Sequence, residues 1–413
     1  MKIRMAVLAL LAGLGGLALA QEPEESHSTS PPAGRESKVV EELKYKQHPG
    51  LAYAASKIYF SDKRYSISGY GEVNAVKASE DQSAGGGDLE LYYTNLYRFS
   101  TFLGYKIKPN LIFNFEFLGE FLHDGTQEYG RDIVIEAMLD YLIHRNFNLR
   151  FGFYPLPMGY INNNDEPVMF RSVNRPEVER LIIPSSWISL GVMGFGAVPR
   201  TESLTWSLGV VGGLDAAEFQ PGSWLRQGRQ IHHGLPKDAA AHGQLGWSSG
   251  EHLQLGLSGY YGQSGAEAPD AVERVRATTS LGAVHFRYAP GRASVVGVAS
   301  MGGLRNTEGL YELTGRTLGA RTNGMYVEPS YAFRNGKLPL FARFERLNTH
   351  ARVAGALQPF RANEGDLRIV TTGVNYLPKR NLVFKANYQF RWNRSPFAAP
   401  EANLMEFGFG FIY

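Results

Sequence analysis

Cysteine is absent from the 413 residues, and so is any long apolar run after the first twenty positions. Without cysteine the chain can form no disulfide framework, no thiolate metal site and no lipoprotein-type anchor. No later segment reaches the roughly eighteen apolar residues that a membrane-spanning helix needs. The formal net charge is only +3, so we expect no nucleic-acid partner.

The first twenty residues have the composition of an export signal. "MKIRMAVLALLAGLGGLALA" carries Lys2 and Arg4, continues as an apolar stretch and ends in the small-residue pattern "ALA". This order predicts a secretory signal peptide over residues 1–20. Residues 21–60 form a predicted periplasmic N-terminal tail, because "EPEESHSTSPPAGRESK" is too polar to bury a core. The remaining residues, 61–413, are expected to form one domain.

That domain is rich in glycine and aromatic residues and alternates with a period of two. In "LVFKANYQFRW", Phe384 and Trp392 share one face, while Lys385 and Arg391 share the other. The stretches "LIFNFEFLGEF" and "DIVIEAMLDYLIH" alternate in the same way. A packed core mixes large and small side chains, whereas repeated aromatic faces suit a membrane interface. We therefore expect the apolar faces to contact lipid and the polar faces to line water.

Connection lengths give an independent test of this interpretation. Short turns are predicted at 108–110, 145–148, 199–202, 248–251, 289–292, 334–337 and 378–381. Longer polar loops lie between them, at 77–90, 123–131, 155–189, 214–237, 263–273, 303–321, 348–365 and 393–401. An even strand number puts both termini on the short-turn side. The predicted fold is all-β: a transmembrane antiparallel β-barrel of about 16 strands with short periplasmic turns and long extracellular loops.

The chain ends on a strand with a fully apolar face. In "NLMEFGFGFIY", large apolar residues occupy five alternate positions: Met405, Phe407, Phe409, Phe411 and Tyr413. This ending resembles the C-terminal signature of bacterial outer-membrane barrels, which the barrel-assembly machinery recognises. The resemblance implies outer-membrane lipid and that machinery as partners.

A barrel of this size is too wide to be filled by its own side chains, so an aqueous lumen is expected. The predicted function is a porin, a water-filled channel for passive diffusion of small polar or charged solutes. Residues 155–189 form the longest connection, and loops of this length are usually functional or disordered. Because Phe170, Leu181, Ile182 and Trp187 need burial, we expect this loop to fold into the lumen and constrict it.

Two stretches carry a resemblance to a known family. "FYPLPMGYINNNDEPVMFRSVNRPEVERLIIPSSW" and "KIYFSDKRYSISGYGEVN" resemble the phosphate-selective porin O and P family, and more closely its uncharacterised relatives in Gram-negative bacteria. The resemblance covers residues 56–413 and implies a homotrimeric, sixteen-stranded porin of the cell outer membrane. The phosphate-selective members line their pore with an arginine ladder and a lysine cluster. No matching basic motif is found here, so anion selectivity does not follow.

Candidate pore residues come from the loop and from the inward faces of the strands. The loop supplies Arg171, Arg175, Glu177, Glu179 and Arg180. The strands supply Arg98, Glu116, Glu120, Glu136, Asp140, Arg150, Arg343, Glu345, Lys385 and Arg391. Acids gather on the third and fourth strands and bases on others, which resembles the transverse field of general porins. The alternative, equally open, is that these groups pair as structural salt bridges within the lumen.

Two other classes of function compete with a channel. An enzyme would need a nucleophile and base on one wall, but no GxSxG, HExxH or P-loop motif occurs. We therefore expect no catalytic, cofactor or metal site. A non-conducting barrel acting as structural anchor or adhesin is the second alternative. Its loops would be the functional part, and 214–237 and 303–321 show no repeat or separate domain.

Overall fold

The computed structural model describes residues 47–78, 95–123, 129–201, 203–229, 238–250, 252–265, 275–398 and 401–413. The predicted signal peptide and most of the predicted tail lie outside these residues. Sixteen strands account for most of the described chain. They are β1 (Tyr65–Ala78), β2 (Asn95–Lys108), β3 (Leu111–His123), β4 (Tyr129–His144), β5 (Phe147–Pro155), β6 (Ile188–Ala197), β7 (Leu204–Gly212), β8 (Ala239–Ser249), β9 (Leu253–Gln263), β10 (Thr278–Tyr288), β11 (Ala293–Leu304), β12 (Arg321–Phe333), β13 (Leu338–Arg352), β14 (Asp366–Lys379), β15 (Leu382–Asn393) and β16 (Leu404–Ile412).

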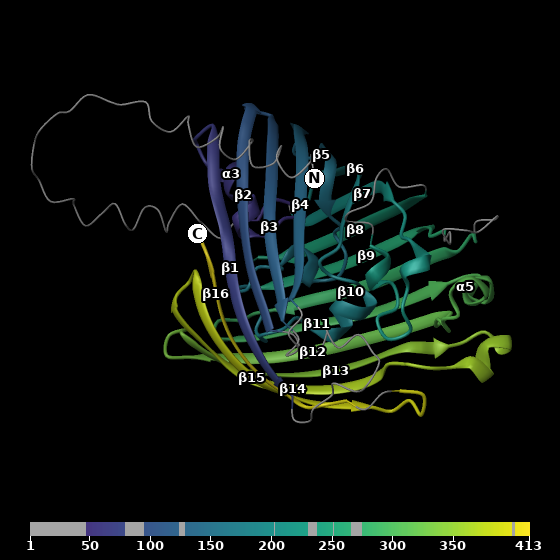
Figure 1. Cartoon of the computed structure of the whole chain (residues 1–413). Coiled ribbons are helices and arrows are strands. Elements are labelled where there is room, and N and C mark those ends of the chain that lie inside the picture. Colours follow the sequence, from purple (N-terminus) through teal and green to yellow (C-terminus); the bar gives the residue numbers. More distant parts are fainter. Residues whose placement is uncertain are drawn as a thin grey trace, which may run out of the picture. The chain divides into compact units, whose positions relative to one another are not determined.

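The strands form one closed antiparallel barrel in which each strand pairs with its neighbours in sequence (Figure 1). The ends of the sheet meet where β1 pairs with β16, with Tyr70 opposite Ile412 and Ala78 opposite Leu404. Tyr413 extends this ladder, because its backbone exchanges hydrogen bonds of 2.9 and 3.1 Å with Gly69. The predicted strand number and the closure are therefore confirmed. Short and long connections alternate as predicted except between β3 and β4, where residues 124–128 make a connection no longer than the predicted short turn between β6 and β7, residues 198–203.

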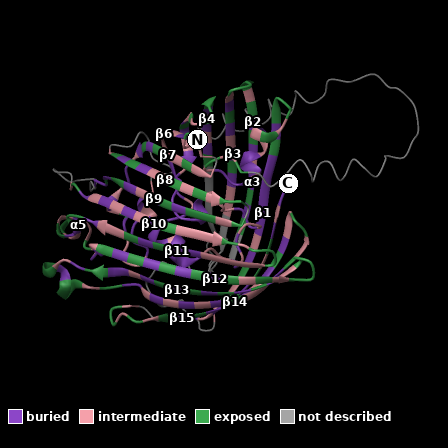
Figure 2. Cartoon of the chain, turned by 180° about the vertical axis from the view of Figure 1, so that it is seen from behind, coloured by how far each residue is buried: buried purple, intermediate pink, exposed green. Residues whose placement is uncertain are grey.

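Side chains alternate between the interior and the exterior along the strands, which gives the banded colouring of Figure 2. On β15, Phe384 and Trp392 are 46% and 51% exposed, while Lys385 and Arg391 are buried. On β16, Phe407 is exposed on the outside, and Glu406 is buried on the inside. A barrel that exposes aromatic rings outward and buries charges inward has the pattern of a membrane barrel rather than of a soluble one.

Short helical segments occur at the start of the described chain and in the long connections. They are α3 (Tyr53–Phe60), η2 (Ile161–Asn163), η3 (Val178–Ile182), η4 (Ala216–Glu218), η5 (Arg226–Gly228), α5 (Thr307–Thr314) and η6 (Gly355–Phe360). None of the helices in the described part of the chain is long and apolar enough to cross a bilayer.

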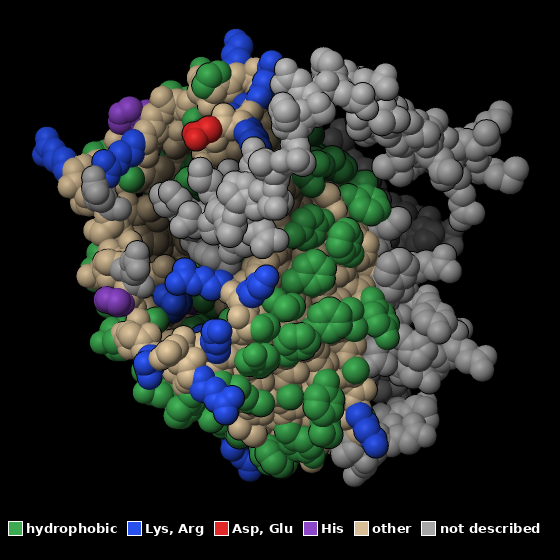
Figure 3. All heavy atoms as spheres, turned by 90° about the vertical axis from the view of Figure 1, so that its left-hand side faces the viewer, with side chains coloured by type: hydrophobic (Ala, Val, Ile, Leu, Met, Phe, Trp, Pro, Cys, Tyr) green, Lys and Arg blue, Asp and Glu red, His purple; other side chains and the backbone are tan. Residues whose placement is uncertain are grey.

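The short-turn end of the barrel is strongly basic. Figure 3 shows Lys and Arg side chains in several places beside a broad hydrophobic band, with little acidic surface in view. Among the described residues near the short turns, Asp62 is the one acid. The basic residues there are Lys63, Arg64, Lys106, Lys108, Arg145, Arg200, Arg292, Arg334, Lys337, Lys379 and Arg380. This end therefore combines an apolar belt with a cationic rim.

Candidate functional site: the lumen and its long loop

The connection from β5 to β6, residues 155–189, lies inside the barrel. Its backbone amides donate to side chains on widely separated strands: Gly159 N to Ser258 Oγ on β9 at 3.2 Å, and Val173 N to Asn387 Oδ1 on β15 at 2.7 Å. The loop thus crosses the interior, as its apolar residues predicted, and Leu181, Ile182 and Trp187 are buried.

Two polar side chains hold the loop in shape. Glu179 Oε1 accepts hydrogen bonds from the backbone amides of Tyr160 and Ile161 and from the Tyr326 hydroxyl on β12, at 3.0 to 3.2 Å. Burial raises the pKa of Glu179 to about 7. Asn162 accepts from the Trp187 amide at 2.6 Å and donates to carbonyls at both ends of the loop. These bonds tie distant parts of the loop to one another and hold it in one shape.

The N-terminal segment also lies against the inner wall. Helix α3 packs on β1, β2 and β3, with Asn114 Nδ2 donating to the Ala55 carbonyl at 2.7 Å. The amide of Ala54 donates to Glu166 of the long loop at 2.6 Å. Burial raises the pKa of Glu166 to about 8. Residues 47–60, which the sequence placed in a tail, therefore contact both the barrel wall and the loop.

The candidate residues on β2 to β5 form buried ion pairs. Arg98 contacts Glu72 at 2.6 Å and Glu120 at 3.4 Å. Asp140 and Arg150 are joined by two hydrogen bonds of 2.8 Å. On the same wall, the register places Glu116 directly opposite Glu136, and the Ser100 hydroxyl donates to Glu116.

Asp140 is also the anchor of the N-terminal segment. Its Oδ2 lies 3.1 Å from His48 Nε2 and accepts from the Tyr59 hydroxyl at 3.0 Å. The His48 and Tyr59 rings stack with centroids 3.7 Å apart. Burial lowers the pKa of His48, although Asp140 opposes that shift.

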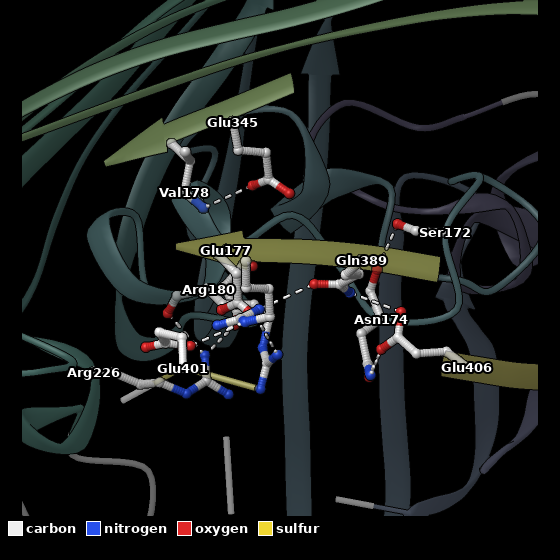
Figure 4. A network of polar contacts seen from close by, with 12 residues as sticks. Ser172, Asn174, Glu177, Val178, Arg180, Arg226, Glu345, Gln389, Glu401 and Glu406 are labelled. Atoms are coloured by element: carbon white, nitrogen blue, oxygen red, sulfur yellow. Dashed lines mark hydrogen bonds and ion pairs between the residues drawn. The ribbon is translucent and has the colours of Figure 1, made fainter. Parts of the chain in front are cut away.

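The candidates on β13 and β15 bind the long loop, and Figure 4 shows Glu345 of β13 beside Val178 of the loop. Arg391 contacts Glu177 at 3.1 Å and Glu401 at 3.0 Å. Val178 N donates to Glu345 Oε2 at 3.3 Å. Lys385 donates to the Ser172 carbonyl at 2.9 Å, and its Nζ lies 3.7 Å from the centre of the Phe170 ring.

Arg343 joins the same wall. It contacts Glu345 at 2.7 Å and Glu328 at 2.9 Å and donates to the Ser172 hydroxyl. These charged side chains form ion pairs within the lumen, as the alternative of structural salt bridges expects, and several of them also contact the loop.

The remaining loop candidates differ from one another. Arg175 donates to Ser186 Oγ at 2.6 Å and lies 3.6 Å from Asp165, and Arg180 lies 3.0 Å from Glu177. Arg171 is half-buried and has no ion pair within the described chain. The structure places all fifteen candidates, but their contact with a permeating solute stays a prediction.

The sequence-based candidates leave out the wall formed by β6 to β10. A cavity of about 250 Å³ lies between this wall and the segment from Gln47 to Leu51. Among the described strand residues that line it there is no acid, lysine or arginine, and they include Ser207, Gln244 and His285. Gly256 makes room for His285, because a Cβ there would lie 2.1 Å from that ring. The sequence gives one sign of this uncharged wall: strands of small residues such as "AAAHGQLGW", residues 239–247, contain no Asp, Glu, Lys or Arg.

Comparisons with known proteins support the fold. No family model matches the chain. An uncharacterised protein of Aquifex aeolicus (strain VF5) is 28% identical over 362 residues, covering 83% of this chain and 79% of that protein. It supplies no function.

Solved structures of porins share the barrel. An anion-selective porin from Comamonas acidovorans has a TM-score of 0.55 at 11% identity, covering 84% of this chain and 99% of its own. Pseudomonas putida OprB has a TM-score of 0.55 at 9% identity, covering 89% of this chain and 100% of its own. The trimer form of Vibrio cholerae OmpT has a TM-score of 0.51 at 14% identity, covering 84% of this chain and 99% of its own. At these identities the likeness shows the fold alone: a porin-like, sixteen-stranded barrel.

Proposed function

We propose that this protein is an outer-membrane porin that lets small polar solutes diffuse passively through its lumen. The observation that carries the proposal is the inverted polarity of a closed barrel: aromatic residues such as Phe384 and Phe407 outside, charged residues such as Arg98 and Lys385 inside. A barrel of sixteen strands encloses more space than its own side chains fill. The loop 155–189 then narrows the passage rather than completing a solid core.

The proposal also covers export, barrel assembly and the oligomeric state. Residues 1–20 direct export, and the strand ending at Tyr413 is presented to the assembly machinery. The protein forms a homotrimer, as the trimer form of Vibrio cholerae OmpT does. The likeness of 56–413 to the phosphate-selective porin O and P family suggests a common ancestry without a common selectivity.

Single-channel recording in a planar lipid bilayer tests this function. The purified mature protein should produce stable, ohmic conductance steps, and the reversal potential in a salt gradient should report its ion preference. A protein that inserts, resists denaturation by detergent at room temperature and yet passes no current would refute the porin assignment.

One observation favours the alternative of a non-conducting anchor or adhesin. Helix α3 packs inside the barrel on β1 to β3, and η3 of the long loop packs on β11 to β13. Ile58 of α3 and Leu181 of η3 are buried, as is Leu51 just before α3. An electrically silent barrel that conducts only after this filling is removed would support that alternative.

A further inference from the structure

The cavity beside β6 to β10 differs from the rest of the lumen in its chemistry. Of the residues that the structure describes, 22 line it, and none of these 22 is Asp, Glu, Lys or Arg. Arg287 lies two positions from His285 on β10 and is not among the lining residues. Asp140 and Arg150 lie behind the lining residues His48 and Gly50, but they pair with each other. An ion placed in the cavity would leave water without a countercharge of its own, which is costly. The lining therefore favours a neutral guest over an anion or a cation.

Four polar atoms of the lining are buried and lack a hydrogen-bond partner within the described chain. They are Asn163 Oδ1, Ser207 Oγ, Gln244 Nε2 and His285 Nδ1. An amide oxygen accepts, an amide nitrogen donates, and a hydroxyl does both. Buried polar groups normally have partners. These four atoms are closed to a water-sized probe, so a turn of the side chain is needed to bring each of them to a guest that both donates and accepts hydrogen bonds.

The remainder of the lining is apolar and close by. Leu51, Met193, Phe195 and Tyr160 contribute apolar surface to the same cavity. The Tyr160 ring meets the His285 ring edge-on, with centroids 5.9 Å apart. A volume of about 250 Å³ has room for roughly eight water molecules, which is below the roughly 300–1,000 Å³ of sites for drug-sized ligands. It suits a compact guest with polar edges and a less polar face.

We propose that this cavity is a binding site for a neutral, polyhydroxylated solute of about monosaccharide size. Hydroxyl groups supply both donors and acceptors to Asn163, Ser207 and Gln244, and the C–H face of such a solute lies against the apolar lining. The inference rests on the proposed porin function and deepens it, since it names the class of solute that the lumen retains. Because the site involves the N-terminal segment through Gln47 and Leu51, binding also stabilises that segment.

The test measures binding separately from conduction. Isothermal titration of glucose into the purified mature protein in detergent should give saturable heat, and sodium phosphate titrated in the same buffer should not. Ser207→Ala and Gln244→Leu each remove one hydrogen-bonding group while keeping the volume similar. Each should weaken glucose binding about fivefold, which corresponds to the net value of one hydrogen bond.

Ser300→Ala is the matched control, because Ser300 is an inward serine on β11 that bonds to the Gly324 carbonyl and is not in the lining. It should leave the affinity for glucose unchanged. Absence of saturable heat with the wild-type protein overturns the proposal, as does equal binding by Ser207→Ala, Gln244→Leu and the wild type. If Gln244→Leu fails to fold, Ser207→Ala alone decides. Binding by an electrically silent protein would refute the porin function and keep this site.

Discussion

At the scale of single residues, the lumen is organised by carboxylates that each serve more than one element. Asp140 binds Arg150 on the neighbouring strand and, through His48 and Tyr59, the N-terminal segment. Glu166 links the long loop to α3 through the Ala54 amide. Buried ion pairs are weak evidence for stability as such, but removing one partner leaves a buried charge uncompensated. Single substitutions at these positions therefore test the arrangement.

Asp140→Asn should destabilise the barrel by about 3–5 kcal/mol, because Arg150 loses its counterion in a buried site. Urea unfolding in detergent micelles, followed by tryptophan fluorescence, measures the change. Asp62→Asn is the control, since Asp62 lies near the short turns with no ion pair in the described chain, and should shift stability by less than about 0.5 kcal/mol. Equal unfolding midpoints for the two variants would show that the Asp140 network carries little energy.

The pKa of Glu166, about 8, lies above the ordinary carboxyl value of 4.5, so the folded protein holds a proton that the unfolded segment releases. Raising the pH from about 6.5 to about 9 should therefore destabilise the packing of α3 by about 2 kcal/mol. Hydrogen exchange of residues 53–60, corrected for its intrinsic pH dependence, measures this loss.

Glu166→Gln keeps the acceptor for Ala54 and cannot ionise, so it should reduce the pH dependence. The pKa of Glu179, about 7, acts in the same direction, and Glu179→Gln is its companion. The lowered pKa of His48 places its titration below this pH range. A wild-type protein with pH-independent protection of α3 would contradict the prediction.

Arg171 and Arg175 test whether charge on the loop affects permeation. Replacing both with alanine should raise conductance and weaken any preference for anions, because two cations leave the narrowed lumen. Since Arg175 is paired with Asp165 and Arg171 has no ion pair in the described chain, Arg171→Ala alone should cause most of the change in selectivity. Unchanged reversal potentials for both variants would exclude that role.

At the scale of elements, the strands and the lumen contents differ in how their contacts form. The strands are held by continuous ladders from β1 to β16, whereas α3 and the loop 155–189 are held largely by side-chain contacts to the wall. The ladders do not depend on the lumen contents for their hydrogen bonds. Removing one internal element should therefore leave a closed barrel.

Deleting residues 47–60 should increase single-channel conductance while the protein still resists denaturation by detergent at room temperature. The increase is expected because α3 and the segment before it occupy space between β1, β3 and the loop. A deletion of equal length at 25–38, outside the described residues, should leave conductance unchanged. If both deletion variants have the same single-channel conductance as the intact protein, α3 does not obstruct the solute path.

The sequence predicted the strands well and the lumen contents only in part. Strands such as "LVFKANYQFRW" could be predicted because lipid on one side and polar groups on the other impose a strict period of two. Helix α3 has no such signal: "YAASKIYF" has eight residues and is surrounded by barrel wall and loop. The partners of the candidate charges, such as Glu328 for Arg343, were not predictable, because barrel register brings together residues on different strands.

At the scale of the whole molecule, the exterior has two zones. Exposed apolar residues lie along the strands, and Figure 3 shows them as a broad band beside Lys and Arg side chains. Arg64 and Arg380 are among the basic residues near the short turns. Arg64 lies over the Tyr105 ring at 5.2 Å, a pairing of cation and aromatic ring that suits the boundary between headgroups and hydrocarbon. The cost of a charge on the exterior should therefore depend on its depth.

Strand β9 offers two leucines on the same outward face for this test. Leu257, at mid-strand, is 54% exposed, and Leu253 begins the strand beside the short turn. Leu257→Lys should destabilise the barrel in lipid vesicles by about 2–4 kcal/mol, whereas Leu253→Lys should cost about 0–1 kcal/mol, because lysine near the boundary keeps its ammonium group in water. Unfolding by urea, measured from both directions, gives the two values. Equal costs would mean that the exposed belt does not lie in hydrocarbon, and a protein that stayed soluble and monomeric without detergent would lead to the same conclusion.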